Sequence, residues 1–400
     1  MKFVFVDTTI GSELIGGAQM FLPSLLEGLV KQGHEVSLLA NGEPNEKVRN
    51  AIVSSHAKLH LNIRGSAGLV DDEVAGWASF LNGENPDVLI VSVSPDVGWV
   101  ILPHLCPRIA VVNIAHSNGY EFYNPLKYYS QFVNRSVGVS QEICSKFESY
   151  CGVPQEKIDW IPYGVTPSIE LPATPSDGGE LRLVYVGRLA EPDKKVSDLI
   201  RIVERLRVDV LPFTLEVIGD GPMMPRFKSD LAAEIESGRV RMHGWIDNPA
   251  LLQRLRASDV SLLVSESEGF CIALVEEMAN GCCPIVTDIE SGNKQLVENG
   301  VNGLVVPVGD VDAFVDRIKL LAADRSRLNE MRRAAWYTGK QYSVDRMVEN
   351  YVSCFERAIE DARSNPRTPD PNFPLMESCR SKYPLWLRRL KAKAVRFANG

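Results

Sequence analysis

The stretch Glu268-Gly-Phe-Cys-Ile-Ala-Leu-Val-Glu276, continued by Glu277-Met-Ala-Asn-Gly-Cys-Cys-Pro-Ile-Val286, decides the fold of this chain. The run before it, Asp259 to Val264, is apolar and β-prone. A glutamate-glycine pair interrupts this run, and Ile272 to Asn280 has the composition of a helix. The pattern therefore predicts a strand, a loop and a helix in direct succession.

A strand that feeds a helix in this way can bind an anion. The first amides of the predicted helix, near Phe270 to Ile272, lack intrahelical partners and lie at the positive end of the helix dipole. A phosphate can bind there, and Gly269 allows it to approach closely. Glu268 would face what lies beyond the phosphate, while Glu276, two turns along, could reach a diol such as a ribose. The arrangement suits a nucleotide-sugar.

The bulk composition predicts a soluble globular protein of two or three domains. The chain has 400 residues, of which 45% are hydrophobic. A net charge of -8 argues against a general nucleic-acid binder, which would carry a basic domain. No run of 18 apolar residues is present, and the apolar start, Met1 to Asp7, lacks the cleavage pattern of a secretory signal. The eight cysteines are scattered, so we expect reduced thiols and a cytoplasmic protein.

Runs typical of strands alternate with helical stretches, which indicates parallel sheets with helices on both faces. In the first half these runs are Phe3–Val6, Val36–Ala40, Leu59–Ile63, Val88–Val93, Ile109–Ile114 and Val137–Val139. In the second half they are Leu183–Val186, Leu215–Ile218, Val240–His243, Ser261–Val264 and Pro284–Thr287. A polar segment rich in proline and glycine separates the two sets. We expect an α/β protein of two doubly wound domains that face each other across a cleft, with binding motifs at the carboxyl ends of the strands.

Three cations follow the first strand of the second set. Gly187-Arg188 comes directly after it, and Lys194-Lys195 opens the next helix. Fixed cations at a strand end could grip a diphosphate. They could equally be solvated surface charges.

Glycines mark further strand ends. Gly219 lies in a turn after the second strand of this set, and His243-Gly-Trp245-Ile246 follows the third. In the first domain Gly16-Gly17 precedes a helix, Gln19–Lys31, that carries a leucine stripe. A glycine pair at a helix start permits a close phosphate approach, although all these glycines could simply turn the chain.

Together these motifs resemble the retaining glycosyltransferases of family 4, which have the GT-B fold of two Rossmann-like domains. The family pattern begins Glu-Gly-Phe-Gly and has Glu-Ala-Met-Ala at its end. Here Cys271 stands in place of the second glycine and Glu277 in place of an alanine, and Gln19 replaces a glutamate of the glycine-pair motif. The resemblance covers about residues 1 to 345, with the motifs in the same order.

The resemblance implies that Arg188 and Lys194 neutralise the leaving nucleoside diphosphate. The spacing is one residue longer than in the family, so Lys195 stays open. No Asp-X-Asp follows a predicted strand, so the cations would replace a metal, and no cofactor is expected. The acceptor hydroxyl would attack the anomeric carbon on the face from which the diphosphate departs, and stabilisation of the leaving group would be the main catalytic effect.

The remaining site residues take their roles from the same resemblance. Glu268 would orient the hydroxyls of the donor sugar, Glu276 would bind the ribose, and His116 would contact the donor sugar or organise the acceptor. Nucleotide and sugar contacts are further expected from Gly16, Gly17, Gly187, Gly219, Trp245, Ile246, Gly269, Phe270, Cys271 and Ile272. Ile246 is the candidate for contact with the base, through its main chain.

The expected protein is a glycosyltransferase that moves a sugar from a UDP- or GDP-linked donor to a sugar, glycan or lipid-linked acceptor, with retention, in glycan, polysaccharide or glycolipid biosynthesis. Two alternatives stay open at this point. One is a nucleotide-sugar epimerase or a glycogen-synthase-like enzyme of the same fold. The other is a catalytically silent protein that binds nucleotide-sugars. An NAD-linked dehydrogenase is disfavoured because no Gly-X-Gly-X-X-Gly follows an early strand.

The expected domains are an acceptor-side domain (residues 1–165), a linker (166–180), a nucleotide-sugar-binding domain (181–342), a C-terminal helix (343–364) and a tail (365–400). The tail starts with prolines typical of an extended linker. Residues 382–397 then carry six cations and an apolar stripe at helical spacing, and residues 381–400 contain no acid. A basic amphipathic helix can bind an anionic membrane surface at the inner face of the cell membrane, or dock on its own acidic domain.

Overall fold

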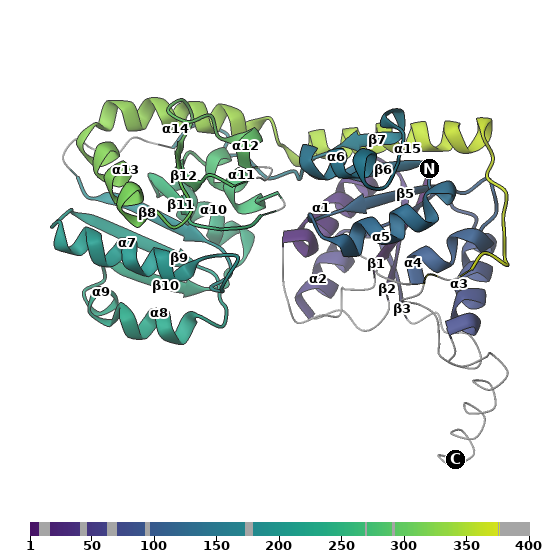
Figure 1. Cartoon of the computed structure of the whole chain (residues 1–400), viewed down its shortest axis with the longest axis horizontal. Helices are drawn as coiled ribbons and strands as arrows, with labels where there is room; N and C mark the ends of the chain where they lie inside the picture. Colours follow the sequence, from purple (N-terminus) through teal and green to yellow (C-terminus); the bar gives the residue numbers. More distant parts are fainter. Residues whose placement is uncertain are drawn as a thin grey trace, which may run out of the picture. The chain divides into compact units, whose positions relative to one another are not determined.

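The computed structural model describes residues 1–7, 17–40, 46–61, 70–92, 97–172, 179–268, 270–289, 293–374 and 376. The chain forms two compact units. Unit 1 consists of Met1–Pro162 and Met347–Gly400, and unit 2 of Tyr163–Arg346. Figure 1 labels their helices and strands.

Unit 1 is built on a parallel sheet of seven strands in the order β3-β2-β1-β4-β5-β6-β7. The strands are β1 (Lys2–Asp7), β2 (Glu35–Ala40), β3 (Lys58–Leu61), β4 (Val88–Val91), β5 (Ala110–Ala115), β6 (Arg135–Gly138) and β7 (Ile158–Trp160). The strand order reverses between β1 and β4, as in a Rossmann fold. The carboxyl ends of these two strands therefore mark the usual ligand-binding edge.

The helices of unit 1 connect these strands. They are α1 (Gly17–Lys31), α2 (Glu46–Ser54), α3 (Val70–Glu84), α4 (Val97–Val100), η1 (Leu102–His104), α5 (Tyr120–Tyr129), η2 (Ser130–Phe132), α6 (Gln141–Ser149) and η3 (Gln155–Lys157). The predicted leucine stripe of α1 is buried, because these side chains lie in the core of the unit.

The long helix α15 (Val344–Ser364) packs on unit 1, although it follows unit 2 in the sequence. Phe355 lies with its ring centroid 4.8 Å from that of Phe3 and 6.4 Å from that of Phe5 on β1. A Cβ atom on Gly28 of α1 would lie only 2.3 Å from Val348, so this glycine lets the two helices approach closely. The apolar face of α15 thus completes the core of unit 1.

Unit 2 has a parallel sheet of six strands in the order β10-β9-β8-β11-β12-β13. The strands are β8 (Leu181–Val186), β9 (Phe213–Ile218), β10 (Val240–Gly244), β11 (Val260–Leu263), β12 (Cys283–Thr287) and β13 (Leu304–Val306). This is the Rossmann order, with the reversal between β8 and β11. Both sheets confirm the prediction of doubly wound α/β architecture.

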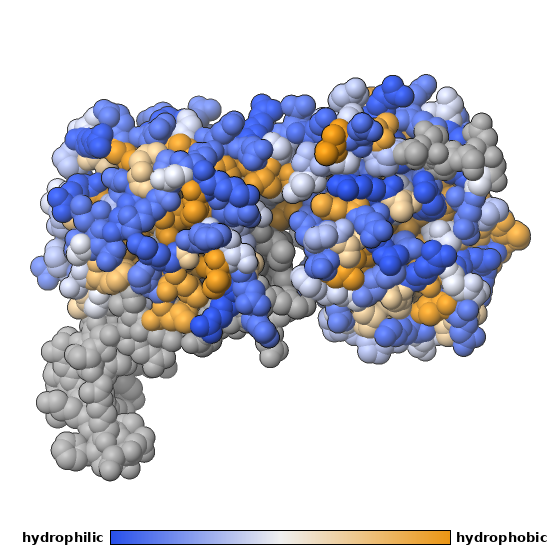
Figure 2. All heavy atoms as spheres, turned by 180° about the vertical axis from the view of Figure 1, so that it is seen from behind, coloured by the Kyte–Doolittle hydropathy of each residue, from blue (hydrophilic) through white to orange (hydrophobic). Residues whose placement is uncertain are grey.

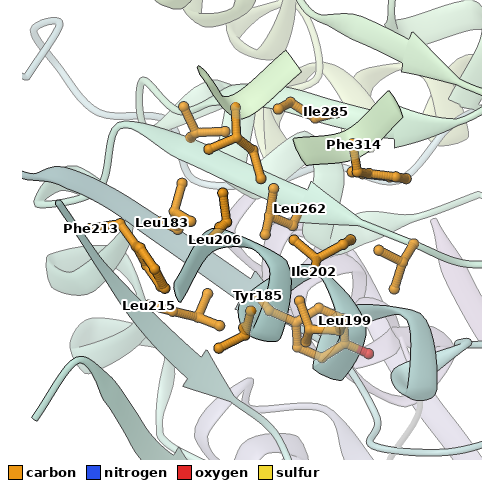
Figure 3. Packing of buried hydrophobic residues seen from close by; sticks show 14 of the residues in the cluster. Leu183, Tyr185, Leu199, Ile202, Leu206, Phe213, Leu215, Leu262, Ile285 and Phe314 are labelled. Atoms are coloured by element: carbon orange, nitrogen blue, oxygen red, sulfur yellow. The ribbon is translucent and has the colours of Figure 1, made fainter. Parts of the chain in front are cut away.

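The helices of unit 2 are α7 (Val196–Val208), α8 (Met224–Asp230), α9 (Ala232–Glu236), α10 (Asn248–Arg256), α11 (Ile272–Ala279), α12 (Asn293–Leu296), α13 (Val311–Ala323) and α14 (Arg325–Lys340). Helix α7 packs beside α13, and α11 packs beside both α10 and α14. Figure 3 shows leucines of α7 and Phe314 of α13 packed against apolar side chains of the sheet. On the face drawn in Figure 2 hydrophilic residues prevail, and hydrophobic ones form separate small groups.

All eleven predicted strands form, and among the described residues their ends differ from the prediction by a residue or two. The sequence did not predict β7 and β13, which lie at sheet edges and have three residues each. Such short runs carry no readable periodicity.

The chain enters unit 2 at Tyr163, earlier than the expected linker at 166–180. The reason is a set of contacts made by the residues directly after Pro162. Val165 forms a bridge with Ser343, and the amide of Ser168 donates to the carbonyl of Ala279 at 3.0 Å. These hydrogen bonds attach the segment to unit 2 before the proline-rich stretch begins.

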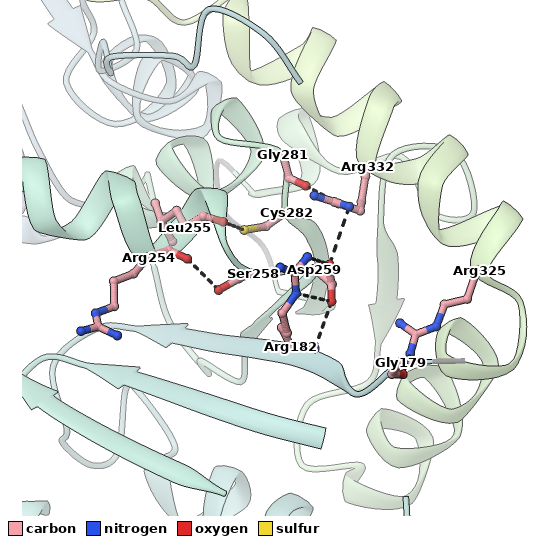
Figure 4. Close-up of polar contacts among 10 residues, drawn as sticks. All are labelled: Gly179, Arg182, Arg254, Leu255, Ser258, Asp259, Gly281, Cys282, Arg325 and Arg332. Atoms are coloured by element: carbon pink, nitrogen blue, oxygen red, sulfur yellow. Dashed lines mark hydrogen bonds and ion pairs between the residues drawn. The ribbon is translucent and has the colours of Figure 1, made fainter. Parts of the chain in front are cut away.

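A buried polar network holds the base of the β11–α11 segment (Figure 4). Asp259, just before β11, accepts from the guanidinium of Arg182 at 2.6 and 3.0 Å. Arg332 of α14 lies 3.6 Å from the same carboxylate and donates to the carbonyl of Gly281, just after α11, at 2.7 Å. Arg332 thus links Asp259, which precedes β11, to Gly281, which follows α11.

The proline-rich segment after α15 is not the extended linker that we expected. Arg367 donates to the carbonyls of Ile109 at 2.6 Å and Cys106 at 2.9 Å. The ring of Phe373 packs against Phe132 at 5.0 Å, and also against two tyrosines of α5. Prolines do not prevent docking here, because side chains of the segment find a hydrogen-bonding and an aromatic site on unit 1. The basic stretch 382–397 lies outside the described residues.

Candidate functional site

Two loops of unit 2 meet where its strand order reverses. One loop, residues 187–195, follows β8, and the other, residues 264–271, follows β11. The carbonyl of Asp193 in the first loop accepts from the amide of Glu266 in the second at 2.8 Å. Parallel α/β sheets bind ligands at such a switch point. The predicted cations and acids of unit 2 are therefore brought to the expected edge of the sheet.

Lys194 and Glu268 form the central contact between these loops. Nζ of Lys194 lies 2.5 Å from Oε1 of Glu268, and the two side chains are 19% and 10% exposed. The same carboxylate oxygen accepts from the hydroxyl of Ser265 at 2.7 Å. Burial lowers the pKa of Lys194, but the nearby Glu268 carboxylate outweighs this effect, so the pKa lies above its usual value. Lys194 is therefore a fixed cation.

The other two cations lie nearer the surface. Arg188 is exposed and donates to the carboxylate of Asp193 at 2.8 Å. Lys195 pairs with the exposed Glu266 at 3.0 Å. The sequence left the choice between the two lysines open, and only Lys194 pairs with the predicted acid. Sequence reasoning missed Asp193 and Ser265, which orient the predicted residues.

Helix α11 begins at Ile272, as predicted, with Cys271 at its N-cap. The Cys271 thiol makes no cap hydrogen bond, and burial raises its pKa well above the usual range. The ring of Phe270 is buried 5.7 Å from that of Tyr163 and so anchors the loop. Gly269, expected to permit phosphate approach, lies outside the described residues.

The surroundings of the Glu276 carboxylate fit its predicted role in binding a ribose. It lies one turn into α11, it is partly buried, and within the described part of unit 2 its carboxylate has no hydrogen-bond or ion-pair partner. Burial raises its pKa to about 7. An ionised carboxylate in this position would gain from two hydroxyl donors, as a ribose diol offers. The neighbouring Glu277 is buried, and burial raises its pKa well above its usual range.

Glycines bring three strand ends of unit 2 into close contact. The amide of Gly187 donates to Ile218, and the amide of Gly219 donates to Gly244 at 2.8 Å. A Cβ atom on Gly219 would lie 2.0 Å from the carbonyl oxygen of Gly187, and its φ is +136°. Only glycine allows this backbone approach, so these positions do more than turn the chain.

The segment after β10 carries the predicted base contact, Ile246, and the predicted substrate-binding residue Trp245. Trp245 is exposed, and Ile246 packs partly against the small apolar cluster formed by Val184, Ile218, Leu255 and Cys282. His243 pairs with Glu216 of β9, which also accepts from Arg241 and Arg254. Glu216 was missed by sequence reasoning because it lies inside a strand, where its partners are decided by the neighbouring strand.

In unit 1, His116 follows β5 and is buried beside Ser92, which follows the adjacent strand β4. Oγ of Ser92 lies 2.8 Å from Nε2 of His116, and the ring of Phe21 on α1 lies 5.4 Å away. Burial lowers the pKa of His116 to about 3, so the imidazole is neutral at physiological pH. Gly17 is the first residue of α1, and Gly16 lies outside the described residues. Ser92 is a strand-end polar residue that the rule used for His116 would have identified.

The described residues contain neither a cluster of metal ligands nor a helix suited to span a membrane. No group of three or more histidines, cysteines or acids is placed to hold a metal ion among them. In the same part of the chain, no helix combines the length and the hydrophobicity needed to cross a membrane.

Both halves of the chain match known protein families. Residues 15–169 match the family described as Glycosyltransferase Family 4, and residues 169–338 match Glycosyl transferases group 1. A poly(glycerol-phosphate) alpha-glucosyltransferase of Bacillus subtilis (strain 168) is 22% identical over 294 residues, which cover 71% of this chain and 43% of that protein. A lipopolysaccharide 1,6-galactosyltransferase of Escherichia coli (strain K12) is 26% identical over 229 residues, which cover 56% and 61%. The chain thus spans about half the length of these curated relatives.

The crystal structure of Anabaena HepE in complex with UDP shares the fold. It matches with a TM-score of 0.71 over 89% of this chain and 100% of that chain, at 18% identity. The two α/β units therefore have the architecture of the GT-B glycosyltransferases.

Proposed function

The chain belongs to the glycosyl transferases group 1, with an N-terminal half of the Family 4 type, and we propose that it transfers a sugar from a UDP- or GDP-linked donor to a hydroxyl acceptor with retention of anomeric configuration. The observation that carries this proposal is the contact between Lys194 and Glu268 at the switch point of unit 2. A fixed cation and a carboxylate side by side suit a donor that has a diphosphate at one end and hydroxyls at the other.

The leaving group is stabilised by charges that are already in place. Lys194 and Arg188 face the negative charge that develops on the diphosphate as the bond to the anomeric carbon breaks. Such preorganised charges lower the barrier because they need no rearrangement during the reaction. Glu268 accepts hydrogen bonds from the sugar hydroxyls while its own position is held by Lys194 and Ser265.

The nucleotide end of the donor binds at the N-terminal part of α11. Main-chain amides near Phe270 to Ile272 bind a phosphate, and Glu276 accepts hydrogen bonds from the ribose. The segment at Trp245 and Ile246 contacts the base, and Gly187 and Gly219 let the donor approach the strand ends. These roles need no resident metal or cofactor.

The transfer step balances without a further reagent. The acceptor oxygen forms a bond to the anomeric carbon, and the bond between that carbon and the phosphate oxygen breaks with its electron pair on the diphosphate. The acceptor proton passes to the departing phosphate oxygen on the same face. In unit 1 the neutral His116, held by Ser92, contacts the donor sugar or the acceptor as a hydrogen-bonding group rather than a charge.

The acceptor belongs to a polysaccharide or glycolipid in the cytoplasm. Support comes from the relatives named as poly(glycerol-phosphate) and lipopolysaccharide sugar transferases. A lipid-linked acceptor would also explain the basic stretch 382–397, which we propose to bind an anionic membrane surface.

The test is turnover of a panel of UDP- and GDP-sugars by the full chain, with and without lipid-linked and free sugar acceptors. We expect one donor to release nucleoside diphosphate faster with an acceptor, and NMR of the product to show the anomeric configuration of the donor. An epimerase would instead produce a new nucleotide-sugar without release of diphosphate. A silent binding protein would show a thermal shift with nucleotide but no turnover.

A further inference from the structure

A group of aromatic and polar side chains lies at the carboxyl edge of the unit 1 sheet. Tyr120 is the first residue of α5 and is 63% exposed. Its ring centroid lies 5.4 Å from that of Tyr150 and 6.3 Å from that of Tyr123, in edge-to-face geometry. These contacts fix the orientation of an aromatic ring that remains open to solvent.

The supporting tyrosines are themselves held by polar contacts. Tyr150 donates its hydroxyl to Asn124 at 2.8 Å, and Nζ of Lys127 lies 4.4 Å from the centroid of its ring. Tyr123 is buried and donates its hydroxyl to Oδ1 of Asn118 at 2.7 Å. Tyr120 is therefore preorganised on a rigid base.

Two polar groups from neighbouring strand ends meet beside Tyr123, which packs against Tyr120. Asn118 follows β5 and donates its amide to the carboxylate of Glu142, which follows β6. A carboxylate can accept several hydrogen bonds, and the amide group of Asn118 carries two donor hydrogens. This tyrosine patch, defined as Asn118, Tyr120, Glu142 and Tyr150, thus combines an apolar ring face with a carboxylate and an amide.

We infer that the tyrosine patch binds an uncharged sugar ring of the acceptor, an inference that rests on the proposed function. The C–H face of a sugar packs on an aromatic ring, and its vicinal hydroxyls pair with a carboxylate and an amide. The carboxylates of Glu121 and Glu142 both act on Tyr123 and outweigh the ammonium of Lys127 over Tyr150, which disfavours a phosphate at this place. The acceptor recognised here is therefore a carbohydrate rather than a lipid phosphate.

The position of the patch relative to His116 supports an acceptor role. The ring of Phe122, two residues after Tyr120, lies 6.3 Å from that of His116 in edge-to-face geometry. His116 and Tyr120 both follow β5, and Glu142 follows the neighbouring β6, at the edge where such sheets bind ligands. A sugar on Tyr120 would thus lie at the same edge as the buried histidine.

The experiment measures sugar binding to the full chain by saturation-transfer NMR, with methyl glucoside, methyl galactoside, methyl N-acetylglucosaminide and maltose as probes. Tyr120→Ala should weaken binding of the preferred sugar roughly tenfold, because it removes the stacking face. Tyr120→Phe keeps the ring and should bind within about twofold of the parent. Tyr337→Ala, which removes a tyrosine of unit 2 that is 58% exposed, serves as the matched control and should change nothing.

The sugar-binding measurements test this inference without any assay of turnover. It is overturned if none of the four sugars binds the parent chain, or if Tyr120→Ala binds as the parent does. Donor turnover separates it from the proposed function. Release of nucleoside diphosphate in water should be equal in the parent and in Tyr120→Ala, while the KM for the sugar acceptor rises only in the variant. If no donor turns over, the proposed function fails although sugar binding still tests the patch.

Discussion

Nζ of Lys194 lies 2.5 Å from Oε1 of Glu268, although 74 residues separate the two in the sequence. The pair joins the loops after β8 and β11 and leaves Lys195 to a different partner, Glu266. Two residues predicted separately, one as a diphosphate cation and one as a sugar-orienting acid, thus act as a unit.

Replacing Lys194 with Ala should lower the transfer rate by about 10²–10³, because a preorganised charge near the developing anion is lost. Lys195→Ala should stay within about threefold of the parent, since its ion pair is largely exposed. Steady-state kinetics at saturating donor measures both. A double-mutant cycle with Glu268→Gln should show non-additive losses, whereas additive losses would contradict the paired role.

We expect Arg188 to contribute to catalysis but little to stability. Its ion pair with Asp193 is exposed, so Arg188→Ala should leave the melting temperature nearly unchanged. Its transfer rate should nevertheless fall by about 10²–10³. Thermal denaturation and turnover of the same preparation provide the two measurements, and unchanged kinetics in both Arg188→Ala and Lys194→Ala would reject the diphosphate site.

Glu276 should make donor binding depend on pH. With a pKa of about 7, its carboxylate is protonated below neutrality and can no longer accept two hydrogen bonds from the ribose. The affinity for free nucleoside diphosphate should therefore fall as the pH drops from 8 to 6, and Glu276→Ala should bind weakly at both. Calorimetry measures this affinity. Glu268→Ala should instead impair transfer at saturating donor, and equal effects of the two variants on both quantities would refute the division of roles.

A rise in pH should strengthen nucleotide binding through Glu276, but the same residue should make the ligand-free protein less stable as the pH rises. A carboxyl whose folded-state pKa is raised destabilises the protein increasingly as the pH rises from its unfolded value, near 4.5, through its folded value. Glu276→Gln should thus stabilise the ligand-free protein, by about 2 kcal/mol more at pH 8 than at pH 5.5. Urea denaturation at the two pH values tests this, and the exposed Glu349→Gln on α15 serves as control. An equal effect of Glu276→Gln at both pH values would mean that the pKa is not raised.

Gly219 is expected to tolerate no side chain. A Cβ atom would meet the carbonyl oxygen of Gly187 at 2.0 Å, so Gly219→Ala should lower the free energy of unfolding by more than about 2 kcal/mol. Gly238 has a positive φ too, +75°, but open space around it, and Gly238→Ala should cost about 1 kcal/mol. Chemical denaturation compares the two. Similar losses would show that the close approach of the strand ends has no energetic weight.

The tail should bind anionic vesicles independently of the segment that docks on unit 1. Truncation after Met376 removes the basic stretch but keeps Arg367 and Phe373, whereas truncation after Asn365 removes these contacts as well. Both truncations should abolish co-sedimentation with anionic vesicles, which salt should also weaken. Only the truncation after Asn365 should lower the melting temperature. Full-length and truncated chains that sediment alike would exclude the membrane role.

The sequence alone determined the alternation of strands and helices, since burial in a parallel sheet leaves an apolar run that can be read locally. It also placed Glu268, Arg188 and His116 after strand ends, because turn residues follow the apolar runs, and Glu276 on the helix that comes next. The family resemblance rested on these same local motifs, in their order along the chain.

Only the tertiary structure decided which residues meet. Lys194 and Lys195 are neighbours with the same chemistry, and their partners lie on a loop that follows a different strand. Helix α15 follows unit 2 in the sequence but packs on unit 1, since its apolar face complements β1 and α1 there. The prolines after α15 suggested an extended linker, yet Arg367 and Phe373 find their partners more than 200 residues away. Contacts between distant segments depend on packing complementarity, which local periodicity does not encode.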